Sequence, residues 1–173
     1  MYDKRTAISF QFEQKPKILI VQSSYYEEVA TLLAQGALQV LNSAGVSYEI
    51  IDVPGAFEIP VAIGYAVKSM SFEAEASRFD GYVALGCVIK GETHHDQIVG
   101  SESAHGLMEV ALRYTLAIGN GILTCNTLEQ ALRRAQPDGF DRGGAAAEAC
   151  LRMIELKHLF HLSSRRQPRA SSL

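Results

Sequence analysis

The chain has 173 residues, of which 47% are hydrophobic and 20% charged, and its formal net charge is −3 at pH 7. This size predicts one domain with a substantial core, and the composition is ordinary for a globular protein. The acidic balance argues against a general nucleic-acid binder, and the lack of a long apolar run argues against a membrane span. Residues 1–15 also lack the apolar core of a signal peptide.

The cysteines suggest the cellular compartment. Cys87, Cys125 and Cys150 are odd in number and far apart, and none of them belongs to a CxxC pair. We therefore expect buried thiols in a reducing cytoplasm, with neither a disulfide nor a metal site.

The N-terminal part of the chain is predicted to form an arm (residues 1–15), a strand and a helix. Thr6–Phe12 alternates in polarity, which fits an edge strand on this or a neighbouring subunit, or a partly disordered terminus. The apolar run Lys17–Val21 predicts a strand. The helical pattern that follows ends at Asn42–Gly45, where Gly45 is the natural left-handed cap.

A second strand is predicted at Val46–Val53, followed by a turn and a helix over Val61–Ser69. Pro60 fits the first turn of that helix because a helix leaves the amide hydrogens of this turn unpaired, and proline has none. The polar residues 70–78 predict a solvated connection.

The stretch 79–99 organises the rest of the chain. Tyr82–Ile89 is an apolar run between turn residues, which predicts a strand buried on both faces of a parallel sheet. A turn with Thr93, two histidines and an acid follows, and then an amphipathic helix at Ile98–Leu116. An open α/β sheet keeps its chemistry at such a strand end, and a helix start attracts anions.

The C-terminal part continues the alternation of strand and helix. Ala117–Thr124 predicts a strand interrupted at Gly119-Asn120-Gly121, by a bulge or by the close approach of another backbone or a ligand. Thr127 is expected to cap a short helix at Leu128–Ala135. The remaining elements are a loop (Gln136–Gly144), a last helix (Ala145–Phe160) and a flexible tail (163–173). The whole pattern predicts a single α/β domain over residues 1–173, a doubly wound parallel sheet with helices on both faces.

Four polar turns follow the predicted strand ends, so this fold would gather them along one edge of the sheet. They are Ser24–Tyr26, Ala56–Glu58, Lys90–His95 and Thr124–Thr127. The adjacent His94 and His95 point in different directions, and no acid or histidine stands at a convincing ligand spacing from them. A metal site is therefore disfavoured.

Other side chains leave two interpretations open. Arg133 and Arg134 fit solvated surface charge or an anion clamp, since guanidinium binds phosphate in a bidentate fork. Tyr25, Tyr26 and Phe57 fit packing, or stacking on a flat heterocycle. From the residues alone we expect an anion-binding turn beside an aromatic pocket, with the substrate left open.

Four segments resemble the 6,7-dimethyl-8-ribityllumazine synthase family of riboflavin biosynthesis. They are VPGAFEIP (Val53–Pro60), LGCVIKGETHH (Leu85–His95), GNGILT (Gly119–Thr124) and EQALRRA (Glu129–Ala135). The resemblance implies a flavodoxin-like three-layer α/β/α sandwich with a four-stranded parallel sheet. It also implies a transferase that needs no cofactor. The implied reaction condenses 5-amino-6-(D-ribitylamino)uracil with 3,4-dihydroxy-2-butanone 4-phosphate and releases phosphate and water.

The resemblance further implies a pocket for the pyrimidine and its ribityl chain. Tyr25 matches the aromatic position that stacks on the pyrimidine. The other residues implied to line this pocket are Ala56, Phe57, Glu58, Val88 and Ile89.

A second set of residues is implied to bind phosphate and to move protons. Glu92 and Thr93 match the phosphate-binding turn, and Arg134 matches a phosphate arginine that comes from the adjacent subunit. His95, and not His94, matches the proton-transfer histidine.

Some positions depart from the family pattern. Ser24 stands where an arginine is frequent, and Gln97 stands where an acidic residue, a partner for the histidine, is common. Asn120 replaces a frequent phenylalanine that would reach the pocket from a neighbour. Arg142 replaces a usual lysine and keeps its charge, and both Asn120 and Arg142 are expected to contact substrate.

The resemblance also implies a homopentamer, with higher assemblies open, small-molecule substrates, and neither nucleic acid nor membrane as a partner. Two alternatives from other classes are a protein that stores lumazine or riboflavin, and a structural shell subunit with weak catalysis. Thr93, His95 and Arg134 together favour the enzyme, because a flavin store has no use for a phosphate clamp.

Overall fold

The computed structural model describes residues 9–69, 72 and 79–162. Its strands are β1 (Lys17–Ser23), β2 (Ser47–Val53), β3 (Gly81–Ile89) and β4 (Ala117–Cys125). Its helices are α1 (Glu27–Ala44), α2 (Ile59–Ser69), α3 (His95–Tyr114), α4 (Leu128–Ala135) and α5 (Arg142–Leu159), with a 3₁₀ turn η1 at Ala56–Glu58.

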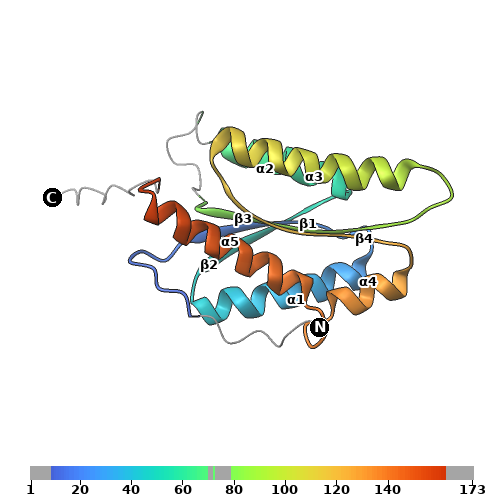
Figure 1. Cartoon of the computed structure of the whole chain (residues 1–173), viewed down its shortest axis with the longest axis horizontal. Coiled ribbons are helices and arrows are strands. Elements are labelled where there is room, and N and C mark those ends of the chain that lie inside the picture. The colour runs from blue at the N-terminus through green and yellow to red at the C-terminus, as the bar shows by residue number, and fades with distance from the viewer. Residues whose placement is uncertain (1–8, 70–71, 73–78, 163–173) are drawn as a thin grey trace.

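The strands form one parallel sheet in the order β2-β1-β3-β4, and helices cover both of its faces (Figure 1). Helices α1, α4 and α5 pack on one face, and α2 and α3 pack on the other. The prediction of a three-layer α/β/α sandwich with a four-stranded parallel sheet is confirmed.

The central strand β3 is the most deeply buried element of the sheet. Every residue from Gly81 to Val88 is buried, because helices cover both faces and β1 and β4 flank both edges. The prediction for this strand is confirmed. By contrast, the edge strand β2 leaves Ile50 and Ile51 each 39% exposed.

Two helices begin three residues earlier than predicted. Helix α3 begins at His95 instead of Ile98, so His95 lies in its first turn. Helix α5 begins at Arg142 instead of Ala145, because the Asp141 side chain accepts a hydrogen bond from the Gly144 amide and caps the helix. The glycines that suggested a loop lie in the first turn of α5.

Strand β4 runs without interruption and pairs residue for residue with β3 through Cys125, so the expected interruption and bulge were wrong. The alternative, a close approach by another backbone, is confirmed. A Cβ on Gly119 would lie only 1.8 Å from the carbonyl oxygen of Ala146 on α5. The glycine therefore lets α5 pack directly on the strand.

The other elements match their predictions with small shifts. Strand β1 is two residues longer than expected, and α2 begins at Ile59, which leaves Pro60 in the first turn. Gly45 caps α1 with φ of 63°, and Thr127 accepts a hydrogen bond from the Gln130 amide at the start of α4, as predicted.

Part of the N-terminal arm lies within the described chain. Residues 9–12 form no strand there; Phe10 and Phe12 stack on each other, and Phe12 meets His158 of α5 edge-on. Pairing with a neighbouring subunit stays a prediction. The expectations for residues 6–8, for all of the connection 70–78 except Phe72, and for the tail 163–173 lie outside the described residues.

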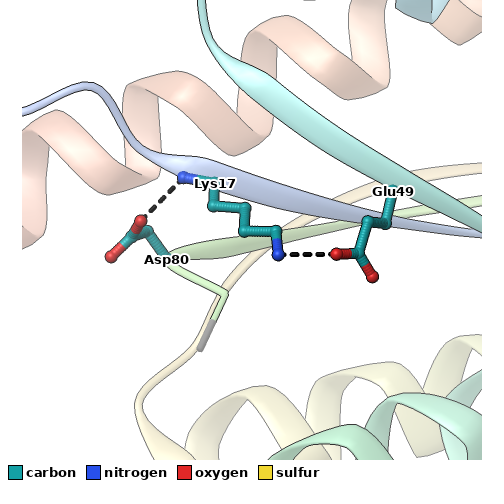
Figure 2. Close-up of polar contacts among 3 residues, drawn as sticks. All are labelled: Lys17, Glu49 and Asp80. Carbon is teal, nitrogen blue, oxygen red and sulfur yellow. Dashed lines mark hydrogen bonds and ion pairs between the residues drawn. The ribbon is translucent and has the colours of Figure 1, made fainter. Parts of the chain in front are cut away.

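A polar cluster fixes the amino-terminal edge of the sheet (Figure 2). The backbone amide of Lys17 donates to a carboxylate oxygen of Asp80 at 2.7 Å, just before β3. The Lys17 ammonium group forms an ion pair with Glu49 on β2. Lys17 of β1 thus links β1 to the neighbouring β2 and to the residue before β3. This cluster lies at the N-terminal ends of the strands, away from their C-terminal ends, where the candidate site is.

Candidate active site

The C-terminal ends of the four parallel strands lie along one side of the sheet, here called its carboxyl edge. A predicted polar turn follows each of these strand ends. Ser24–Tyr26 follows β1, η1 follows β2, Lys90–His94 leads from β3 into α3, and Asn126-Thr127 leads from β4 into α4. The order β2-β1-β3-β4 changes direction between β1 and β3. Open α/β sheets bind ligands at such a switch point.

A cavity of about 530 Å³, here called the aromatic cavity, lies at this switch point. It brings together the predicted Tyr25, Ala56, Phe57, Glu58, Val88, Ile89, Thr93 and His95. Tyr26, which the sequence offered as a second stacking ring, and Gly91, from the predicted polar turn Lys90–His95, also line it. The lining residues that the sequence did not indicate are Gly55, Cys87, Asp96, Ile98 and Val99. Cys87 and Asp96 had a signal, since each immediately precedes or follows a predicted site residue in the chain.

Aromatic side chains form one wall of this cavity. Tyr25 is 73% exposed and Phe57 is 48% exposed, so both rings present free surface. Tyr26 meets Tyr25 edge-on, with ring centroids 5.0 Å apart. Burial and the neighbouring Tyr25 raise the pKa of Tyr26, so its hydroxyl stays neutral and available as a hydrogen-bond donor. The wall is suited to a flat, polar heterocycle.

The cavity floor is the end of β3, and it includes a thiol. Burial raises the pKa of Cys87 to about 12, with a smaller contribution from Cys125. A thiol with this pKa is protonated at neutral pH and is a poor nucleophile. Covalent catalysis by Cys87 is therefore disfavoured, and the thiol acts as an apolar floor.

The turn after β3 supplies the polar wall. The His95 amide donates to the Thr93 hydroxyl oxygen at 3.4 Å, and the amides of Gln97 and Ile98 both donate to the His94 carbonyl. This hydrogen bonding starts α3 with His95 facing the aromatic cavity. His94 does not line that cavity.

A second cavity of about 640 Å³, here called the arginine cavity, adjoins the first, because Val88 and Asp96 line both. Its cationic side chains are Lys90 and Arg134. Arg134 lies in the last turn of α4, and its positive charge partly offsets the effect of burial, which raises the pKa of Cys125 at the end of β4. The guanidinium group therefore lies close to the carboxyl edge of the sheet.

Three predicted residues line neither cavity within one chain. Glu92 is exposed on the turn, and Arg142 begins α5. Asn120 lies on β4, where its side-chain oxygen accepts a hydrogen bond from the Ile122 amide at 2.9 Å. Arg134 is also absent from the aromatic cavity.

The structure shows the neighbours of two residues that depart from the family pattern, Ser24 and Gln97. Ser24 donates a hydrogen bond to Asp52, which also accepts one from the Gln22 side chain at 2.9 Å, so neutral donors hold this carboxylate. Gln97 lines the arginine cavity and not the aromatic cavity with His95.

Among the described residues, no group of three or more histidine, cysteine or acidic side chains could hold a metal ion. The three cysteines are free and buried, as predicted. In the same part of the chain, no helix is both long and apolar enough to cross a membrane.

The fold and the strand-end cavities define a class, the α/β proteins that bind small molecules at the carboxyl edge of a parallel sheet. The sequence model of 6,7-dimethyl-8-ribityllumazine synthase matches residues 15–158, and the chain belongs to this family. The resemblance found in the sequence is confirmed.

Individual relatives agree with this assignment. The chain is 48% identical over 150 residues to the 6,7-dimethyl-8-ribityllumazine synthase of Bartonella tribocorum, which covers 87% of this chain and 95% of that protein. It is 48% identical over 143 residues to the Agrobacterium fabrum protein of that name, with 83% and 95% covered. Identity to 6,7-dimethyl-8-ribityllumazine synthase 1 of Rhizobium meliloti is 49% over 140 residues, with 81% and 90% covered.

Proposed function

We propose that this chain catalyses the reaction for which its family is named. It would condense 5-amino-6-(D-ribitylamino)uracil with 3,4-dihydroxy-2-butanone 4-phosphate, release phosphate and water, and so serve riboflavin biosynthesis. The observation that carries the proposal is the aromatic cavity, where residues following three different strands surround one volume.

The pyrimidine half would occupy the aromatic wall. Tyr25 offers an exposed ring for stacking, and Phe57 borders the same volume. Glu58 is placed to accept hydrogen bonds from the ribityl hydroxyls or the ring N–H groups. Ala56, Val88 and Ile89 would complete the pocket by packing.

The phosphate half would lie at the polar turn. Thr93 contributes a hydroxyl, and the turn at Glu92 and Thr93 can contribute backbone amides beside the positive end of α3. Arg134 would supply the counter-charge. Arg134 lines the arginine cavity and not the aromatic cavity of its own chain. We therefore propose that the adjacent subunit of a homopentamer provides the arginine of each aromatic cavity, together with Asn120 and Arg142.

Chemistry at this site would depend on positioning and proton transfer, with no cofactor. His95 is the group proposed to move protons between the amine and the departing water or phosphate. Cys87, whose thiol is neutral, would not take part. Three buried free thiols fit a reducing cytoplasm, where we place the protein.

The test is to mix the purified protein with both substrates and follow the absorbance of the lumazine product. Product formation that requires both substrates, and that is strongly reduced by His95→Ala, is expected. Tight binding of the pyrimidine or of riboflavin without turnover would instead support the storage alternative. Light scattering on the same sample should give a pentamer or a multiple of it, and an active monomer would contradict the shared site.

A further inference from the structure

Phe140 contacts two consecutive arginines of α4. The Cζ atom of Arg133 lies 5.2 Å from the centre of the ring, and the Cζ atom of Arg134 lies 5.9 Å from it. Both distances are within the range of a cation–π interaction. Consecutive side chains leave a helix about 100° apart, so the two guanidinium groups reach this ring from different directions.

The loop that carries Phe140 is tied down by hydrogen bonds on both sides of the ring. The amides of Gly139 and Asp141 both donate to the Gln136 carbonyl, each at 3.0 Å. Asp141 then caps α5 through the Gly144 amide at 2.9 Å. The ring therefore stands on a fixed turn between α4 and α5 and can restrain a long side chain packed on it.

Arg134 is near both the Phe140 ring and the arginine cavity. Its Cζ atom lies 5.9 Å from the centre of the ring, and the residue also lines the arginine cavity, where its charge acts on Cys125. Arg133 lines a separate outer cavity of about 610 Å³ with Arg134, and does not line the arginine cavity. The two arginines thus share the ring and differ in what else they reach.

We propose that Phe140 is a positioning residue for Arg134. Its ring holds the guanidinium group at the carboxyl edge of the sheet, ready to bind the phosphate of the butanone substrate. This inference rests on the proposed function and concerns the residue that sets the affinity of the anion site. Phe140 lines neither of the cavities at that edge, so it would act through Arg134 and not by touching substrate.

The ring lowers the number of side-chain conformations that Arg134 explores, and phosphate binding then loses less entropy. Removing the π face while keeping an apolar side chain should weaken phosphate binding without disturbing the aromatic cavity. Phe140→Leu makes that change, and Phe140→Trp keeps the π face and is expected to restore binding.

The experiment measures KM for each substrate, and separately the Kd for inorganic phosphate at constant ionic strength, by calorimetry. Phe140→Leu is expected to raise the KM of the butanone phosphate and the Kd of phosphate by roughly 3- to 10-fold. The KM of the pyrimidine and kcat at saturation should stay unchanged, and Phe140→Trp should lie near the native values. The same shift should appear when Arg133→Ala is already present, because the effect passes through Arg134.

Three outcomes would overturn the inference. These are native-like phosphate affinity in Phe140→Leu, an equal loss in Phe140→Trp, and a parallel rise of both KM values. Thermal melts of each variant identify a folding defect, and a Phe140→Trp variant that folds and binds like native still supports the role of the ring. If the native protein makes no lumazine, the proposed function fails, whereas the phosphate titration still decides whether Phe140 positions Arg134.

Discussion

The backbone amide of His95 donates a hydrogen bond to the hydroxyl oxygen of Thr93, at 3.4 Å. This bond folds the turn after β3 into the first turn of α3 and sets the two side chains on one wall of the aromatic cavity. Because the hydroxyl oxygen accepts from the amide, its hydrogen stays free to donate to a phosphate oxygen. One short segment can thus bind the leaving group and carry His95, the histidine proposed to transfer protons.

The two adjacent histidines should differ sharply on substitution. His95→Ala is expected to lower kcat by roughly 10²-fold or somewhat less, the usual contribution of a general acid or base. His94→Ala should do little, since His94 is outside the aromatic cavity. Steady-state turnover with both substrates saturating measures the difference, and equal losses would mean that His95 is wrongly assigned.

The two adjacent arginines provide the matching test for phosphate. A hydrogen bond to a charged group contributes about 1.5–3 kcal/mol, so Arg134→Ala should raise the KM of the butanone phosphate by roughly 10- to 150-fold. Arg133→Ala is the control, because Arg133 does not border the arginine cavity. The KM of the pyrimidine, which carries no phosphate, should stay near native in both variants. A rise of both KM values in Arg134→Ala would point to a structural role.

The packing of α5 on β4 depends on the missing side chain of Gly119. A methyl group there would lie 1.8 Å from the Ala146 carbonyl oxygen, so helix and strand would have to separate. Gly119→Ala is expected to lower the free energy of unfolding by about 3 kcal/mol or more. Gly64→Ala is the control within α2, where a Cβ meets nothing within 4 Å. Alanine should there stabilise the helix by about 0.5–1 kcal/mol. Urea unfolding of both variants measures the contrast, and similar values would refute the close approach.

Much of the fold could be predicted because local chemistry decided it. The apolar run of β3, the glycine cap of α1 and the threonine cap of α4 each determine one element without help from distant residues. In helix α5 only the start was wrongly predicted, and for the opposite reason. Its first turn contains Gly143 and Gly144, and a Cβ on Gly143 would lie 1.9 Å from the Leu33 carbonyl oxygen. Gly143 therefore serves packing against α1, a tertiary demand that overrides poor helix propensity, whereas a Cβ on Gly144 would lie 2.1 Å from the carboxylate of the capping Asp141.

The positions of several candidate site residues were predictable to a similar degree. The positions after each strand follow from parallel topology, so the sequence alone was enough to place Tyr25, Phe57 and His95 on one edge of the sheet. The burial of Cys87 was predicted, and its position next to Val88 in the chain was a signal that it lines the cavity. The role proposed for Phe140 was not predictable, because it depends on a loop that returns to α4, and no sequence spacing encodes that relationship.

The last prediction concerns alkaline pH. Burial raises the pKa of Cys150 from 9.0 to about 12, and its thiol donates to the Ala117 carbonyl oxygen at 3.6 Å. Burial likewise raises the pKa of Tyr82 from 10.0 to about 12. In both cases the folded chain keeps a proton that the unfolded chain releases, so the free energy of unfolding is unaffected at neutral pH and falls as pH rises toward 12. Each group adds up to about 1.4 kcal/mol per pH unit to that fall.

Urea unfolding across this pH range measures the free energy of unfolding. The comparison is between the slopes of this free energy against pH, and not between its absolute values. Cys150→Ala should flatten the decline from about pH 9 upward, and Tyr82→Phe should flatten it only from about pH 10 upward. Tyr82→Phe should also be neutral or slightly stabilising at pH 7, because the buried Tyr82 hydroxyl has no hydrogen-bond partner among the described residues. Curves that run parallel to the native one would show that neither group holds its proton more tightly in the folded state.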